Sequence, residues 1–207
     1  MKTKLLLSAM IICGFFIQTA QSQNSYEDSI QAIRNAKNIE FKTPGKTPLN
    51  AAQIQQFTGL SYFPINEKAK IKAVYTPFEE PKEVSLATTA GTKMKLLKYG
   101  TVTFTFENKS YTLDVFQNKN LPEFGNDNSI LFIPFTDPTN KTETFNNGRY
   151  LRLSVPASGT SVYLDFNTAE NPYNAYNKAL VSIVAPPGNA MMSAVNTGER
   201  KFEDRAR

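Results

Sequence analysis

The stretch GRYLRLSVPASGTSVYLDFNTAENPYNAYNKALVSIVAPPGN, residues 148–189, holds two segments in which apolar and polar residues alternate. Such alternation is typical of half-buried β-strands. If the two strands pair antiparallel across the short break between them, their apolar sets share one face and Leu151 lies near Leu164. Arg152 and Asp165 then meet on the opposite face, as a rim ion pair or as part of a polar pocket. The stretch therefore predicts a β-protein with a candidate site at this hairpin.

A polar loop follows the second of these strands. Its amide and carboxylate side chains gather around the Asn171-Pro172 turn, and they are Asn167, Glu170, Asn171 and Asn174. Asn favours loops because its side chain bonds nearby backbone, so an ordinary loop explains most of this pattern. An oxygen-rich pocket for a hard cation or a sugar-like ligand is the alternative. No spacing matches a calcium-binding loop, and we expect neither a metal nor a cofactor.

The N-terminus has the pattern of a secretory signal peptide over residues 1–22. Two lysines precede an apolar run of residues 5–17, and the small residues Ala20 and Ser22 lie three and one before the expected cut. The apolar run is short for a membrane span, and no later segment approaches one. We therefore expect an exported protein, periplasmic or secreted, without a transmembrane segment.

Composition excludes several kinds of chemistry. The chain has no His, and its single cysteine, Cys13, would leave with the signal peptide. Disulfides, Ser-His-Asp and Cys-His nucleophiles and the usual zinc sites are therefore not expected in the exported protein. Basic residues outnumber acidic ones, 23 to 18, but they are scattered rather than clustered, so nucleic acid is not an expected partner. Carboxylate, Tyr, Lys, Arg, Ser and Thr chemistry remains.

The exported part, residues 23–207, has the length of one domain. We expect residues 23–60 to form a helical part and residues 61–207 a β-rich part. One helix is predicted from Ser25 to about Lys37, and a shorter one from Pro48 to Phe57.

From residue 71 onward the period of the apolar residues changes to two. About eight or nine strands are expected, near residues 71–76, 83–88, 93–98, 101–106, 111–116, 129–135, 141–145, 150–155 and 161–166. In the hairpin of residues 101–116, pairing Phe106 with Tyr111 keeps the apolar face whole. We predict a mainly β fold of the α+β kind. It would be an antiparallel barrel or a two-layer sandwich, with one or two N-terminal helices packed outside.

Taken together, these motifs resemble the uncharacterised family known as domain of unknown function 1684. The resemblance rests on ordered segments that span most of the chain, among them FTGLSYFPI (57–65), LFIPFTDPTNKTETF (131–145), LDFNTAENPYNAY (164–176), Pro186-Pro187 and Gly198-Glu199. Members of this family are similar to N-P-x-C-A-Y and S-C-P-x-P-P at two places where this chain has Asn174 and Ile183. The resemblance thus implies that a disulfide or a paired thiol site is missing here. It implies no activity, because the family's function is unknown.

Two functions fit these residues. The first is binding of a small polar ligand, such as a carbohydrate, or of an envelope component. The expected contacts are Arg149, Arg152, Asp165, Asn167, Asn171 and Tyr176, with Tyr173 as a further one. The second is a carboxylate-dependent hydrolase or lyase with Asp165 as general base and Glu199 or Asp114 as the second group. That reaction needs a second carboxylate within about 10 Å of Asp165 across a cleft. A purely structural role also fits each position, and the sequence leaves the oligomeric state open.

Overall fold

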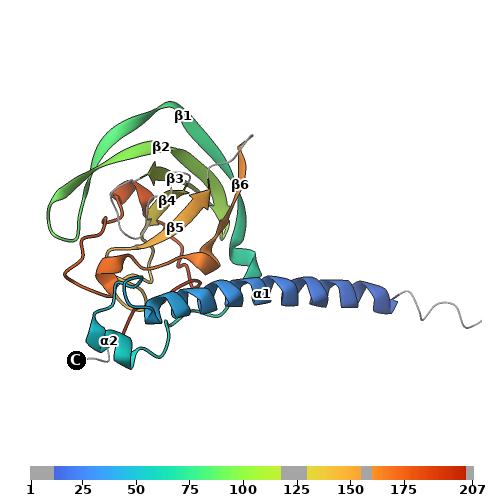
Figure 1. Cartoon of the computed structure of the whole chain (residues 1–207). Coiled ribbons are helices and arrows are strands. Elements are labelled where there is room, and N and C mark those ends of the chain that lie inside the picture. Colours follow the sequence, from blue (N-terminus) through green and yellow to red (C-terminus); the bar gives the residue numbers. More distant parts are fainter. Residues whose placement is uncertain (1–11, 118–129, 155–159, 204–207) are drawn as a thin grey trace, which may run out of the picture.

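A single antiparallel sheet of six strands forms the centre of the molecule and curls into a nearly closed barrel (Figure 1). This computed structural model describes residues 12–117, 130–154 and 160–203, with side chains from residue 25 onward. The strands follow the order β5-β4-β3-β2-β1-β6. Their bounds are β1 Lys70–Ala87, β2 Lys93–Phe106, β3 Lys109–Gln117, β4 Ile130–Phe135, β5 Arg149–Ser154 and β6 Ser161–Asp165. The prediction of a mainly β, barrel-like fold is confirmed.

The predicted number of strands is wrong, because long bent strands replace pairs of short ones. Strand β1 contains 71–76 and, except for Thr88, also 83–88, and the register of its pairing with β2 shifts between Pro77 and Lys82. Strand β2 likewise runs through Gly100, where a β-carbon would lie 2.3 Å from the Thr76 carbonyl oxygen. Such irregularities bend a strand without ending it. In the sequence each of them has the residues of a turn, and for this reason one strand was counted as two. Residues 141–145 form turns instead of a strand.

The hairpin between β2 and β3 has a shorter turn than predicted. Phe104, not Phe106, pairs with Tyr111, and Phe106 pairs with Lys109. The turn consists of Glu107 and Asn108 alone, with φ of 47° and 61°. Two successive positive φ angles are typical of the tight turn whose twist matches a hairpin. Because the register differs by two residues, the apolar face stays the same.

The hairpin predicted between residues 148 and 166 does not form. Strand β5 pairs with β4 and places Leu151 opposite Ile133, whereas β6 pairs with β1 and places Leu164 opposite Ile71. The two strands therefore stand at opposite ends of the strand order, where the barrel comes close to closure. Alternation correctly gave the buried face of each strand, but it carries no information about which neighbour a strand selects.

Three groups of buried side chains stabilise the fold. The main core fills the barrel and includes Val102, Leu113 and Phe166. A second core contains Phe116, Phe132, Tyr150 and Ile183. Alternation along β3 places Phe116 on the face opposite to Val115 of the main core. The third group joins the N-terminal helices to the loop after β6 and consists of Phe41, Leu49, Phe57 and Tyr176.

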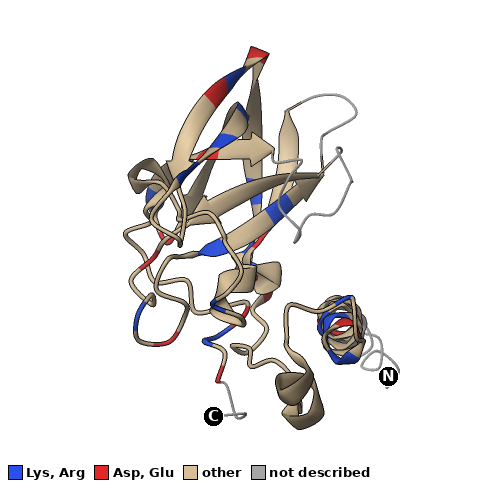
Figure 2. Cartoon of the chain, turned by 60° about the vertical axis from the view of Figure 1, so that its left-hand side comes forward, with Lys and Arg blue, Asp and Glu red and all other residues tan. Residues whose placement is uncertain are grey.

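Helix α1, Ile12–Lys42, lies across one end of the barrel and extends beyond it (Figure 1), and Figure 2 shows the same helix end-on. It begins before the expected Ser25 and ends after the expected Lys37, because no proline interrupts it until Pro44, whose predecessor is disfavoured in a helix. Helix α2, Ala51–Gln56, is shorter than predicted and starts at a capping box of Asn50 and Gln53. Within the described residues, no helix combines the length and apolar character needed to cross a membrane. Residues 1–11 of the predicted signal peptide lie outside the described residues.

Candidate functional site

One stripe of helix α1 faces the end of the barrel. Tyr26, Ile30, Arg34, Lys37 and Phe41 recur every three or four residues, which is the spacing of a single helix face. Ile30 and Phe41 are buried, so the stripe is a packing surface. It nevertheless carries one hydroxyl group and two cations into the boundary between helix and barrel.

Tyr26 contacts two predicted site residues: Asp165, the last residue of β6, and Asn167, which lies in the following 3-10 turn η3 (Phe166–Thr168). Its hydroxyl donates to the two carboxylate oxygens of Asp165 at 2.9 and 2.8 Å and accepts from Asn167 Nδ2 at 2.9 Å. Asn167 Oδ1 in turn accepts from the Asn66 backbone N–H at 2.8 Å. Burial, together with the neighbouring Asp165 carboxylate, raises the pKa of Tyr26. Asp165 and Asn167 thus fasten the helix to the barrel.

Replacing Tyr26 with phenylalanine should lower the free energy of unfolding by about 1 kcal/mol, since the lost bonds go to a charged group but are partly exposed to water. Hydrogen exchange of the α1 amides near residue 26 should accelerate as well. Tyr163→Phe on neighbouring β6 is the matched control, because Tyr163 is 61% exposed. Equal effects of the two substitutions would contradict the fastening role of Tyr26.

The predicted pairing of Arg152 with Asp165 is wrong, because their strands are not neighbours. Arg152 Nε instead contacts Glu170 Oε1 at 2.6 Å. Glu170, which the sequence places only in the polar loop, binds Lys37 Nζ through its other oxygen at 2.8 Å. A cation from the helix and a cation from β5 therefore share this one carboxylate.

Glu199 lies on the other side of Lys37. Its Oε2 is 3.3 Å from Lys37 Nζ and accepts from the Asn171 backbone N–H at 2.8 Å. Its Oε1 accepts a short hydrogen bond from the hydroxyl of Tyr176. Three predicted residues, Glu199, Asn171 and Tyr176, therefore come together, and all three are buried.

The two carboxyl groups beside Lys37 differ in acidity. Burial favours the neutral form of both, but Lys37 and Arg152 together outweigh it at Glu170 and lower the pKa of that group. At Glu199, burial prevails over Lys37, Tyr176 and the Asn171 N–H, so the pKa is raised. The pKa of Lys37 is raised, since the two carboxylates more than compensate for its burial. Lys37 is thus held as a cation between Glu170, the more acidic of the two groups, and Glu199, the less acidic one.

Arg34 and Tyr62 form a further contact beside this cluster. Only 7% of Arg34 is exposed, and its guanidinium carbon lies 4.4 Å from the centroid of the Tyr62 ring, a cation–π geometry. Within the described residues, Arg34 Nε, Arg34 Nη2 and the Tyr62 hydroxyl are buried without a hydrogen-bond partner. Burial lowers the pKa of Arg34 and raises that of Tyr62.

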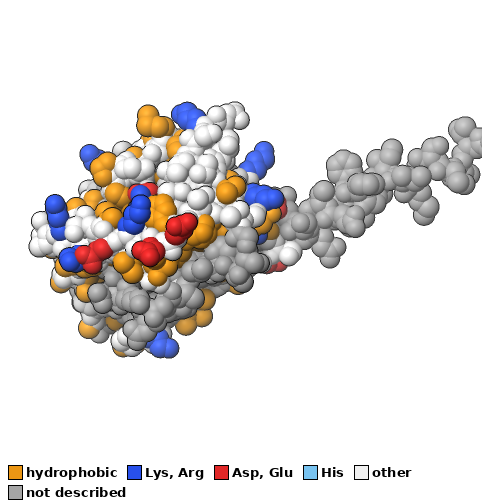
Figure 3. Space-filling model, turned by 90° about the horizontal axis from the view of Figure 1, so that it is seen from above, with side chains coloured by type: hydrophobic (Ala, Val, Ile, Leu, Met, Phe, Trp, Pro, Cys, Tyr) orange, Lys and Arg blue, Asp and Glu red, His pale blue; other side chains and the backbone are white. Residues whose placement is uncertain are grey.

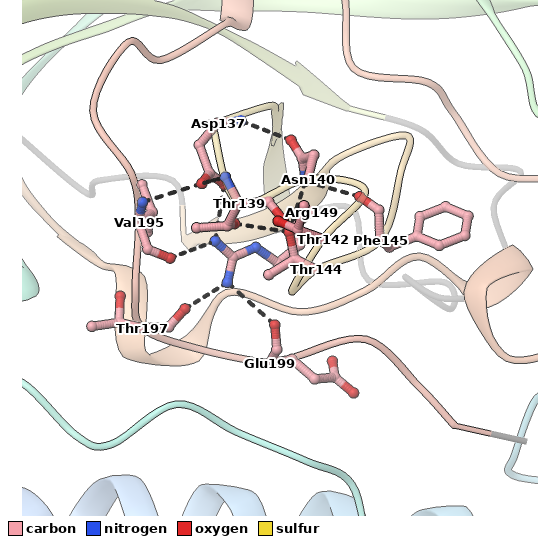
Figure 4. Close-up of polar contacts among 10 residues, drawn as sticks. All are labelled: Asp137, Thr139, Asn140, Thr142, Thr144, Phe145, Arg149, Val195, Thr197 and Glu199. Carbon is pink, nitrogen blue, oxygen red and sulfur yellow. Dashed lines mark hydrogen bonds and ion pairs between the residues drawn. The ribbon is translucent and has the colours of Figure 1, made fainter.

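Arg149 belongs to a separate buried network (Figure 4). The side chains of Arg149 and Asp137 are both fully buried, and Nη2 lies 3.0 Å from Asp137 Oδ2. The guanidinium also donates to three backbone carbonyls of the C-terminal segment, those of Val195, Thr197 and Glu199. This predicted ligand contact therefore holds the segment that carries Glu199, and no part of it reaches the surface.

Other predicted residues lie away from these clusters or at their margin. Tyr173 lines a shallow groove of about 400 Å³ together with Glu40 and residues 45–48.

Asp114 forms an ion pair with Lys98 at 2.7 Å. Asn174 and Ile183 stand where the resemblance implies cysteines. Asn174 Nδ2 donates to the Leu180 carbonyl, and Ile183 packs in the second core. Across the described residues, no three His, Cys, Asp or Glu side chains converge as metal ligands.

Sequence reasoning missed Arg34, Lys37 and Tyr62. The first two could have been found, because they occupy the apolar stripe of α1, where an uncompensated cation is unusual. Tyr62 gives no such signal. It reaches the site through an isolated bridge between its backbone and that of Glu199, a pairing across 137 residues that no local pattern encodes.

Comparison with known proteins identifies relatives of unknown function. A family model described as a protein of unknown function (DUF1684) matches residues 55–200. Among solved structures, the chain is similar to that of an uncharacterised protein from Haloarcula marismortui, with a TM-score of 0.66 and 28% sequence identity. That similarity covers 87% of this chain and 96% of the other. The search of curated proteins found no match.

Proposed function

The chain belongs to the DUF1684 family of proteins of unknown function, and we propose that it is an exported protein that binds a small polar ligand between helix α1 and the end of the barrel. The observation that carries this proposal is the set of buried donors on Arg34 and Tyr62 that have no partner among the described residues. The signal-peptide pattern of residues 1–22 supports export.

Energetics favour a partner for these donors. A buried polar group that lacks a hydrogen bond costs about 1–3 kcal/mol, and more when it is charged. Buried polar groups are therefore almost always satisfied by protein, water or ligand. Here three such atoms lie together at one boundary, beside the Lys37, Glu170 and Glu199 cluster.

The predicted site residues have different roles in this proposal. Asp165 and Asn167 fix the helix through Tyr26. Asn171 and Tyr176 hold Glu199, and Arg149 supports the backbone behind it. Arg152 holds Glu170 from the barrel side. They would shape the site, while Arg34 and Tyr62 would contact the ligand.

Native mass spectrometry of the protein as its own host processes it, purified gently, tests this proposal. We expect an added mass that is lost on denaturation and that is absent from Arg34→Met. Arg200→Met is the matched control, because Arg200 also lies over an aromatic ring, at 5.2 Å from the Phe63 centroid, but is exposed. A bare mass that persists after incubation with sugars, nucleotides and small organic acids would overturn the proposal.

The carboxylate-dependent alternative draws on the opposite pKa shifts of Glu170 and Glu199, a pattern typical of acid–base pairs. The same measurement, extended to Asp165→Asn, tests it. A ligand recovered chemically unchanged supports binding alone. Conversion of the ligand by the wild type but not by Asp165→Asn would favour a hydrolase or lyase.

A further inference from the structure

The two Arg34 nitrogens without a hydrogen-bond partner among the described residues, Nε and Nη2, share one edge of the guanidinium group. Nε–H and an N–H of Nη2 point in parallel from that edge, and two parallel donors match the two oxygens of a carboxylate or of a similar oxyanion. The guanidinium carbon lies 4.4 Å from the centroid of the Tyr62 ring, and this cation–π contact helps to hold the group in place. The edge therefore has the geometry for side-on binding of an anion.

The neighbouring carboxylates are already engaged elsewhere. Asp165 accepts from Tyr26 and Asn167, Glu170 binds Lys37 and Arg152, and Glu199 binds Lys37, Tyr176 and the Asn171 N–H. No ion pair joins Arg34 to any carboxylate of the described residues. The charges of Asp165 and Glu199 favour the Arg34 cation, but neither carboxylate lies within ion-pair distance of it. An anion from outside the chain would supply the missing charge and accept both hydrogen bonds.

We propose that Arg34 binds a small carboxylate or an equivalent oxyanion side-on, with the Tyr62 hydroxyl donating a further hydrogen bond. This inference rests on the proposed function and specifies the class of ligand. An anion is favoured over a neutral sugar or amide because the guanidinium has donors only, and its bonds to a charged acceptor are about twice as strong as neutral ones.

Titration followed by NMR of the arginine Nε–H signals tests the proposal directly. The probes are acetate, inorganic phosphate and the neutral acetamide, each added to the protein after its own ligand has been removed by mild denaturation and refolding. We expect acetate or phosphate to shift the Arg34 Nε–H signal and acetamide to leave it unchanged. A response to acetate alone identifies a carboxylate site, and a response to phosphate alone identifies an oxyanion site of the phosphate type.

Three variants complete the test. Arg34→Met should abolish the binding of the anion. Arg34→Lys keeps the charge but lacks the two parallel N–H donors, and it should weaken binding at least about tenfold. Arg200→Met should bind as the wild type does. Circular dichroism of each variant verifies that it is folded.

The possible failures are distinguishable. Binding of acetamide as tight as that of acetate, or an anion affinity unchanged in both Arg34 variants, would overturn the oxyanion assignment and leave the small-ligand proposal standing. An Arg34 signal that responds to no probe would also overturn it. A native mass without any added ligand, together with an Arg34 Nε–H signal that no probe shifts, would overturn both proposals.

Discussion

Replacing Asp137 with alanine is expected to destabilise the protein by about 3–5 kcal/mol, because Arg149 would be left as a buried cation without its counter-ion. Asp137 also accepts from the backbone N–H groups of Thr139 and Val195, at 2.9 and 3.1 Å, and both donors would lose this partner. The free energy of unfolding from urea denaturation at neutral pH measures the loss.

The pair of Arg200 and Glu143 provides the matched control. These residues lie 3.5 Å apart at the surface, and each side chain is nearly half exposed. Glu143→Ala should therefore change the stability by no more than about 1 kcal/mol. Asp137→Asn, which removes the charge but keeps an acceptor oxygen, should lie between the two. A loss for Asp137→Ala as small as that for Glu143→Ala would show that the buried pair contributes little.

The Arg149 network also shows how the C-terminal segment reaches the candidate site. Arg149 donates to the backbone carbonyl of Glu199, so the position of the Glu199 carboxyl group depends on an arginine in the barrel wall. Loosening this segment in Asp137→Ala should therefore also disturb the Tyr176 and Lys37 contacts of Glu199. The two buried clusters are thus connected through the backbone of Glu199.

The sequence supported the fold class because strand alternation directly reflects burial on one face. The alternation could not predict which strands lie next to each other in the sheet. Leu151 and Leu164 fit a local hairpin as well as they fit the pairs with Ile133 and Ile71 that form. The broken pattern at Gly100 is ambiguous for a similar reason, since a bend within a strand and a turn between strands both favour glycine.

Several of the residues singled out from the sequence lie close together. Asp165, Asn167, Asn171, Tyr176 and Glu199 do lie near one end of the barrel, because loop residues rich in amides and carboxylates gather where strands end. Their partners could not be predicted. Tyr26, Arg34 and Lys37 come from a helix more than a hundred residues earlier, and only the docking of that helix brings them to the loop.

The exposed surface offers less guidance. In the view from above the barrel, basic and acidic side chains are interspersed rather than gathered into one patch (Figure 3). Buried charges lie instead at the boundary of α1 and in the network of Arg149 and Asp137.

Replacing Lys37 with methionine should cost about 3–5 kcal/mol at neutral pH. Among the described residues, Glu199 then loses its one ion-pair partner and Glu170 keeps Arg152 alone. Lys42→Met is the control on the same helix, since Lys42 is exposed, and it should cost less than about 1 kcal/mol. Adding Glu199→Gln to Lys37→Met should restore part of the stability, because the uncompensated charge is removed. Additive effects of the two substitutions would contradict the coupling between them.

The cost of Lys37→Met should also depend on pH in a defined direction. The folded-state pKa of Glu170 is lowered, so its contribution is present above the ordinary range of a glutamate and is lost as the pH falls through the folded-state pKa. The pKa of Lys37 is raised, so its contribution is present below about pH 10.4, the ordinary value for lysine, and disappears as the pH rises further. The stability difference between wild type and variant should therefore be greatest between these limits and shrink toward acid, where both carboxyl groups are neutral. Urea denaturation across this range measures the difference, and a cost that stays constant into acid would mean that Lys37 acts through packing and not through charge.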